Sequence, residues 1–160
     1  MSLFEATEEE RRWADIEQRA LKLLTRREHS RLELALKLQQ RRFDESDIEP
    51  VLDRLVAQGW LDDERFADIY ARQRIGLGYG PMRIRAELQQ KGVQHEPEAL
   101  TSVSESAWRE AAIEQRARRF GLTRVADRKE RGRQGRFLAQ RGYTMAQIEA
   151  ALEQTELRRD

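Results

Sequence analysis

The chain has no cysteine, only three prolines, and few aromatic residues, which make up 7% of its 160 residues. Without cysteine it can form neither a disulfide nor a thiolate zinc site, and it has no cysteine nucleophile. No apolar run approaches the roughly 20 residues that a bilayer-spanning helix requires, and residues 1–11 are too acidic and polar for a signal peptide. The sequence therefore predicts a cytoplasmic protein that does not contact a membrane.

Residue patterns typical of catalysis or of metal binding are also lacking. His29 and His95 are the only histidines, and they are far apart in the sequence, so no metal site is expected. The acidic run 62–64 has no further acids converging on it, and capping of a helix explains it better than a Mg²⁺ site. The glycine-rich run 76–80 lacks a preceding strand and a following Lys-Ser or Lys-Thr, which favours a turn between helices over a nucleotide-binding loop. We expect neither enzymatic activity nor a cofactor.

Charged residues are abundant, at 37% of the chain against 39% apolar residues. This balance is typical of helices that pack through narrow apolar stripes and leave much of their surface solvated. The net charge of +1 conceals an asymmetry: residues 109–141 contain eleven Arg or Lys against four Asp or Glu, whereas residues 1–66 contain twelve against sixteen. The basic part is either a solvated helical face or a surface for an anionic partner, and both interpretations stay open.

Apolar residues recur at helical spacing along the chain, and caps and glycines divide it into nine expected helices. Their approximate ranges are 8–27, 30–42, 46–59, 62–76, 81–92, 93–106, 105–120, 127–141 and 144–153. Ser30 and Glu33 have the spacing of a capping box. Pro50 is assigned to the first turn of its helix, where proline is tolerated. Met145 is assigned to the buried face of the last helix.

The sequence aligns with itself when it is shifted by fifty residues. Leucine recurs at 38, 88 and 138, glutamine at 40, 90 and 140, and a basic residue at 41, 91 and 141. Each aligned segment is too small to bury its own apolar stripe, so neighbouring segments are expected to stack. The predicted fold class is all-α, with three tandem three-helix repeats forming an elongated, curved helical body. The repeats are assigned to residues 1–60 with a frayed N-terminus, 61–104, and 105–160 with a charged C-terminal tail.

The stretch 59–92 carries a long pattern with fixed spacing: Gly59, Leu61-Asp62-Asp63, Phe66, Gly78-Tyr79-Gly80-Pro81, Arg83-Ile84, Glu87-Leu88 and Lys91-Gly92. This pattern closely resembles the signature of the RecX family, whose members modulate the RecA recombinase. Residues 137–143 resemble the family's third-repeat element, while Trp60 stands where tyrosine or phenylalanine is usual. The resemblance implies a regulatory protein that binds RecA nucleoprotein filaments and inhibits recombinase, ATPase and coprotease activities. Such a protein modulates homologous recombination, DNA repair and the SOS response.

Two groups of residues are candidates for contact with a partner. The first surrounds the central turn and is predicted to bind the RecA filament or DNA: Arg72, Arg74, Tyr79, Arg83, Arg85 and Lys91. The alternative for these bases is solubility and pairing within a helix, and Tyr79 either packs on a neighbouring repeat or offers a stacking face. The second group is a C-terminal basic patch that would follow a nucleic-acid backbone: Arg116, Arg119, Arg128, Lys129, Arg133 and Arg136.

Other functions stay open beside that of a filament regulator. A helical-repeat protein that binds single- or double-stranded DNA without sequence specificity would lose affinity steeply with salt. A filament regulator should instead prefer RecA-coated to bare strands, and a purely structural scaffold would do neither. The sequence fits both inhibition and stimulation of RecA, and we expect the free protein to be a monomer.

Overall fold

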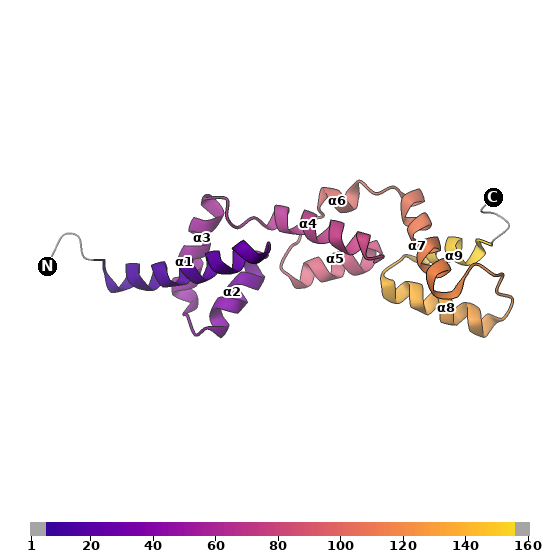
Figure 1. Cartoon of the computed structure of the whole chain (residues 1–160), viewed down its shortest axis with the longest axis horizontal. Coiled ribbons are helices and arrows are strands. Elements are labelled where there is room, and N and C mark those ends of the chain that lie inside the picture. The colour runs from indigo at the N-terminus through magenta and orange to yellow at the C-terminus, as the bar shows by residue number, and fades with distance from the viewer. Residues whose placement is uncertain (1–5, 156–160) are drawn as a thin grey trace. The chain divides into compact units, whose positions relative to one another are not determined.

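The computed structural model describes residues 6–155, and within that range the chain forms nine helices and no strand (Figure 1). The expected all-α class is therefore confirmed. No helix of the described range combines the length and the apolar character that crossing a membrane requires. The helices are α1 (Glu8–Arg26), α2 (Arg31–Gln40), α3 (Glu45–Ala57), α4 (Asp63–Gly76), α5 (Pro81–Gln90), α6 (Glu98–Thr101), α7 (Glu105–Phe120), α8 (Arg128–Arg141) and α9 (Met145–Glu153).

Side-chain caps fix the starts of the helices where the sequence indicated them. The Ser30 hydroxyl accepts a hydrogen bond from the Glu33 N–H at 3.1 Å, and the Glu33 carboxylate accepts one from the Ser30 N–H at 3.2 Å. This is the predicted capping box of α2. Asp62 caps α4 in the same way, accepting hydrogen bonds from the N–H groups of Glu64 and Arg65 at 2.9 and 3.1 Å.

Three expectations about the helices are wrong. The third helix begins at Glu45, after an extended Asp44, so Pro50 lies inside the helix and not in its first turn. The sixth helix shrinks to four residues that begin after Pro97, because a proline disfavours helical geometry in the residue before it. Met145 is 70% exposed, and Gln147 is buried in its place beside Ile148, Ala151 and Leu152 of α9.

The chain divides into two compact units, one of residues 1–67 and 90–95 and the other of residues 68–89 and 96–160. In the first unit, α1, α2 and α3 pack around fully buried Ile16, Leu38 and Leu52. In the second unit, α7, α8 and α9 pack together, with Leu138 and Ala151 fully buried. The assignment of the repeats to residues 1–60, 61–104 and 105–160 stays a prediction.

The fifty-residue register reappears in the backbone. Leu38, Leu88 and Leu138 are all at most 2% exposed. The residues four positions after them, Arg42, Gly92 and Gly142, all adopt left-handed conformations, with φ of 68°, 80° and 103°. The aligned segments therefore share both a buried position and the sharp chain reversal that ends the second helix of each repeat.

Candidate partner-binding site

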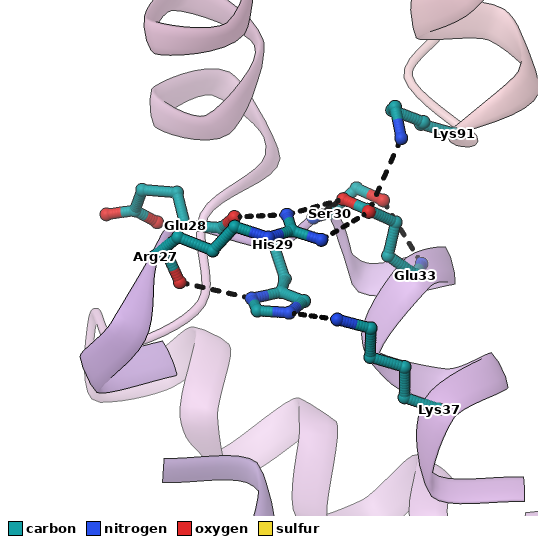
Figure 2. Close-up of polar contacts among 7 residues, drawn as sticks. All are labelled: Arg27, Glu28, His29, Ser30, Glu33, Lys37 and Lys91. Atoms are coloured by element: carbon teal, nitrogen blue, oxygen red, sulfur yellow. Dashed lines mark hydrogen bonds and ion pairs between the residues drawn. The ribbon is translucent and has the colours of Figure 1, made fainter. Parts of the chain in front are cut away.

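A short contact joins the end of α5 to the start of α2 inside the first unit. Lys91 Nζ lies 3.4 Å from a carboxylate oxygen of Glu33 (Figure 2). The backbone of Gly92 lies against Leu32, so that a Cβ at position 92 would be 3.0 Å from the Cβ of Leu32. We call these four residues the first junction. It requires glycine at position 92 for its left-handed φ and for the close approach.

The same contact recurs fifty residues later inside the second unit, where Arg141 and Gly142 meet Met82 and Arg83. The Met82 N–H donates a hydrogen bond to the Gly142 carbonyl at 2.9 Å. A Cβ at Gly142 would overlap the Cβ of Arg83 and come within 2.7 Å of its backbone nitrogen. We call these four residues the second junction. Each junction thus joins the end of one repeat's second helix to the start of the preceding repeat's second helix.

The second junction surrounds the ring of Tyr79 with three guanidinium groups. The centre of the ring lies 3.8 Å from Arg74, 4.3 Å from Arg141 and 4.5 Å from Arg83, all within cation–π distance. Glu87 is the one carboxylate that pairs with these arginines among the described residues, and it accepts two hydrogen bonds from Arg74, at 2.8 and 3.0 Å. The cluster therefore carries an excess of positive charge. Arg141 belongs to the following repeat, which favours the packing interpretation of Tyr79.

Burial and pairing act against each other at Arg74. Burial lowers the pKa of the Arg74 guanidinium, because it disfavours the charged form. The hydrogen bonds to Glu87 raise the pKa by more, so it lies above its ordinary value. Arg83 is 41% exposed, donates to the Gln140 carbonyl at 3.0 Å and lies 3.8 Å from Glu87, the intrahelical pair expected from the sequence. Arg74 is only 18% exposed, whereas Arg83 retains exposed surface for a partner.

The structure brings together only part of the predicted central group. Arg74, Tyr79 and Arg83 share the cluster described above. Arg72 is 73% exposed and pairs with Asp68 of its own helix at 2.9 Å. Arg85 pairs with Glu96, and Lys91 belongs to the first junction. Sequence reasoning left Arg141 out of this group, although its register with Lys91 could have indicated it.

Beside the first junction, His29 is held between two groups of the first unit (Figure 2). Its side chain is buried, with Nδ1 3.1 Å from the Arg27 carbonyl and Nε2 2.9 Å from Lys37 Nζ. An ammonium group can only donate, so Nε2 is the acceptor and Nδ1 carries the proton of a neutral ring. Burial lowers the pKa of His29, and the positive charges of Arg27 and Lys37 lower it further. The pKa of Lys37 is also lowered, first by burial.

Glu33 is the carboxylate that pairs with Arg27 and Lys91 beside this histidine. Burial raises the pKa of its carboxyl group, but hydrogen bonds from Arg27 and Ser30 and the charge of Lys91 outweigh burial and bring the pKa to about 2. The Arg27 guanidinium donates to the Glu33 carboxylate at 3.0 Å. Lys91 and Glu33 pair within the first junction, but with Arg27 and Lys37 beside them the cations outnumber this carboxylate, as they do in the cluster around Tyr79.

One residue of the predicted basic patch is not at the surface. Arg116 is fully buried, and its guanidinium donates to Gln134 Oε1 at 2.8 Å and to the carbonyls of Thr123, Ala151 and Gln154 at 3.0, 3.0 and 2.7 Å. It lies on the inward face of α7, where it satisfies carbonyl groups at the end of α9. Its assignment to an exposed patch is wrong, because a helix's charged residues need not all face solvent.

The other members of the predicted patch differ in their surroundings. Arg133 pairs with Glu130 at 3.0 Å, and Arg119 lies 5.5 Å from the centre of the Phe137 ring. Arg128, Lys129 and Arg136 are exposed, and their side chains pair with no acid among the described residues. Between residues 6 and 155, no group of three or more His, Cys, Asp or Glu is placed to hold a metal ion.

Three family models match the chain in order. They are described as the first, second and third three-helix domains of RecX and match residues 18–55, 62–96 and 108–152. The regulatory protein RecX of Halorhodospira halophila is 46% identical over 135 residues, which are 82% of this chain and 83% of that protein. The regulatory protein RecX of Pseudomonas putida is 44% identical over 134 residues, covering 83% of this chain and 86% of that protein.

Solved structures of similar proteins have the same fold. A crystal structure of regulatory protein RecX superposes with a TM-score of 0.79 at 24% identity and covers 96% of this chain and 83% of that one. A crystal structure of RecX from Lactobacillus salivarius gives a TM-score of 0.75 at 20% identity and covers 91% of this chain and 97% of that one. The predicted family resemblance is confirmed along most of the chain.

Proposed function

Because the chain belongs to the RecX family of regulatory proteins, we propose that it binds RecA nucleoprotein filaments and inhibits their recombinase, ATPase and coprotease activities. It would thereby modulate homologous recombination, DNA repair and the SOS response. A regulator can shift a filament between states only through different affinities for those states. The proposal includes a monomeric protein that acts in the cytoplasm, where RecA filaments form.

The observation that carries this proposal is the positive cluster around Tyr79. Three arginines meet one ring, and Glu87 is the one carboxylate that pairs with them among the described residues, so positive charge is in excess. Arginine binds carboxylates in a planar, bidentate geometry, which suits an acidic patch on a protein surface. Arg83 and Arg85 of α5 are 41% and 39% exposed, so they are the residues that we expect to contact RecA.

The proposal is tested by the single-strand-dependent ATP hydrolysis of RecA, titrated with substoichiometric amounts of this protein. We expect inhibition well below one copy per RecA. The double variant Arg83→Ala/Arg85→Ala should raise the half-inhibitory concentration about tenfold or more, the equivalent of about 1.4 kcal/mol of binding. Arg118→Ala is the matched control, since Arg118 is 71% exposed and pairs only within its own helix. Circular dichroism verifies that each variant is folded.

The unpaired bases on α8 favour a second candidate function, sequence-independent binding of DNA. Arg128, Lys129 and Arg136 could each contact a phosphate. Such a protein would inhibit RecA only when it is abundant enough to coat the strand. Its affinity for bare duplex would fall with salt at a log–log slope of about −0.9 per phosphate contact, or about −0.7 per contact on a single strand. Equal affinity for bare and RecA-coated strands would favour this alternative over filament binding.

A further inference from the structure

An open groove of about 490 Å³ lies between α8 and α9 of the second unit. Its volume falls within the range of about 300–1,000 Å³ that is common for ligand clefts. Most of its lining is apolar or lacks a side chain: Gly132, Gly135, Ala139, Met145, Ile148 and Leu152. A Cβ at Gly135 would be 3.8 Å from Ile148 and 3.9 Å from Leu152, which are 4% and 8% exposed, so these two residues form a largely buried base under a position without a side chain. Met145, which also lines the groove, is 70% exposed. The groove can therefore receive an apolar side chain.

The rim of the groove is positively charged. Arg128, Arg131 and Arg136 line it together with a single acid, Glu149. None of the three arginine side chains has a hydrogen bond or an ion pair among the described residues. Arg133, on the same helix but outside the groove, is neutralised by Glu130 at 3.0 Å. The unbalanced charge of α8 is thus concentrated where the apolar floor is open.

The repeat register explains why this surface is open. In the first two repeats, the start of the second helix contacts the following repeat at residues 32 and 82, although the side chains of Leu32 and Met82 stay 41% and 54% exposed. The equivalent residue of the third repeat is Gly132, and a Cβ there would meet only the side chain of Arg136. No element of the described chain covers it, so a surface used twice for docking is free in the third repeat.

We propose that the groove between α8 and α9 binds an acidic peptide segment of a partner protein. One bulky apolar side chain of the peptide packs on the floor over Gly135, and its carboxylates pair with Arg128, Arg131 and Arg136. The apolar floor favours a peptide over nucleic acid, because a phosphate backbone offers no group that gains from burial there. A peptide on this groove is recognised as an amphipathic segment, with apolar anchors and flanking charges.

A second copy of the chain is a poor occupant on grounds of charge. The register makes Arg41 and Arg42 the equivalents of the junction residues Lys91 and Gly92. A head-to-tail contact between copies would bring these two arginines to the arginine rim of the groove. Like charges placed opposite each other in an interface are strongly unfavourable. An acidic partner removes this repulsion.

The test measures fluorescence anisotropy with a labelled twelve-residue peptide of Asp and Glu that has a single central Phe. A matched peptide with Ala in place of Phe and a labelled dT12 oligonucleotide are compared with it. We expect the Phe peptide to bind about tenfold more tightly than the Ala peptide, because one aromatic side chain is buried. We expect Gly135→Leu, which fills the floor, to weaken the Phe peptide about tenfold and to leave dT12 unchanged.

Charge variants and a conservative variant complete the experiment. Arg128→Glu/Arg136→Glu should abolish peptide binding, whereas Arg118→Glu on α7 should leave most of it. Gly135→Ala adds one methyl group at ordinary contact distance, so it folds and should weaken the Phe peptide by a smaller factor.

Three results would overturn the proposal: equal binding of the Phe and Ala peptides, tighter binding of dT12 than of the Phe peptide, or a dimer of the free protein that Gly135→Leu dissociates. RecA is absent from this assay, so its outcome does not depend on the function proposed above.

Discussion

The ring of His29 is neutral and buried, and its pKa lies below its ordinary value because of burial and the nearby charges of Arg27 and Lys37. The unfolded chain therefore takes up this proton at a higher pH than the folded chain does. The stability contributed by His29 is complete above about pH 6.5 and is lost as the pH falls toward the folded pKa. We expect the free energy of unfolding in urea to fall by about 1 kcal/mol between pH 7 and pH 5.5.

The two histidines provide a matched control for this prediction. His29→Gln should remove most of the pH dependence in this range, because no group at position 29 then titrates. His95→Gln changes an exposed side chain and should keep the wild-type slope. A wild-type slope in His29→Gln would show that another group is responsible.

Arg42 stands where the other two repeats have glycine, and it has a left-handed φ of 68°. A residue with a side chain is destabilised by about 1–2 kcal/mol in this conformation, and glycine is not. Glycine keeps only part of this advantage, because its unfolded chain has more conformational freedom to lose on folding. We expect Arg42→Gly to raise the free energy of unfolding by about 0.5–1 kcal/mol in urea denaturation. Arg41→Gly, at a φ of −87°, should not stabilise the protein. Equal effects of the two variants would contradict this explanation.

Arg116 is a buried cation that pairs with no carboxylate between residues 6 and 155. Burial lowers its pKa, and the charge of Arg131 adds to this effect, yet four oxygen acceptors hold the guanidinium. Arg116→Met keeps the volume but leaves those acceptors unpaired, at a cost of about 1–3 kcal/mol for each one that water does not reach. We expect a loss of about 3 kcal/mol or more in urea denaturation. Arg118→Met, at an exposed site, should change stability by less than about 0.5 kcal/mol.

At the scale of helices and turns, the second junction depends on the absence of a side chain at Gly142. This residue has a φ of 103°, and a Cβ there would overlap Arg83. Gly59, which ends α3, has a φ of 82° and no atom within 4 Å of its would-be Cβ. Gly59→Ala should therefore cost about 1–2 kcal/mol from backbone strain alone. Gly142→Ala should cost clearly more, about 3 kcal/mol, and the difference measures the close packing of the junction.

Local signals predicted the helices better than they predicted the site. The capping box at Ser30 and the glycine stop at Gly142 act over a few residues, so they could be recognised in the sequence. Pro50 was misplaced because the helix begins at Glu45, after Asp44, whose side chain makes no capping hydrogen bond, so no cap pattern marked the earlier start.

The site depends on contacts between distant residues. Arg116 has the same sequence context as exposed arginines, and only the packing of α7 against α9 shows that it is buried. Arg141 meets Tyr79 from another repeat, 62 positions away by number. Self-alignment offered the one signal for this contact, since Lys91 and Arg141 are equivalent.

At the scale of the whole molecule, the charge asymmetry seen in the sequence corresponds to a difference in pairing. In the acidic first part, Arg31 and Arg65 pair with acids, at 2.6 Å in each case. In the basic part, acids are too few, and Arg128, Lys129 and Arg136 remain unpaired among the described residues. The surplus positive charge is therefore a property of the third repeat and of the junction before it, which is where we place the contacts with acidic partners.

The two junctions lie in different compact units, and this predicts that damage to one of them stays local. In a repeat protein, stability is approximately a sum of repeat and nearest-neighbour terms, so a weakened interface lowers the protection of the repeats that it joins. Gly142→Ala should speed amide hydrogen exchange in α5 and α8 and leave α1, α2 and α3 at wild-type rates. Gly92→Ala, with a Cβ 3.0 Å from Leu32, should speed exchange in α2 and leave α7, α8 and α9 unchanged. If either variant accelerated exchange equally in all nine helices, the chain would unfold as one cooperative unit and the junctions would not be separable.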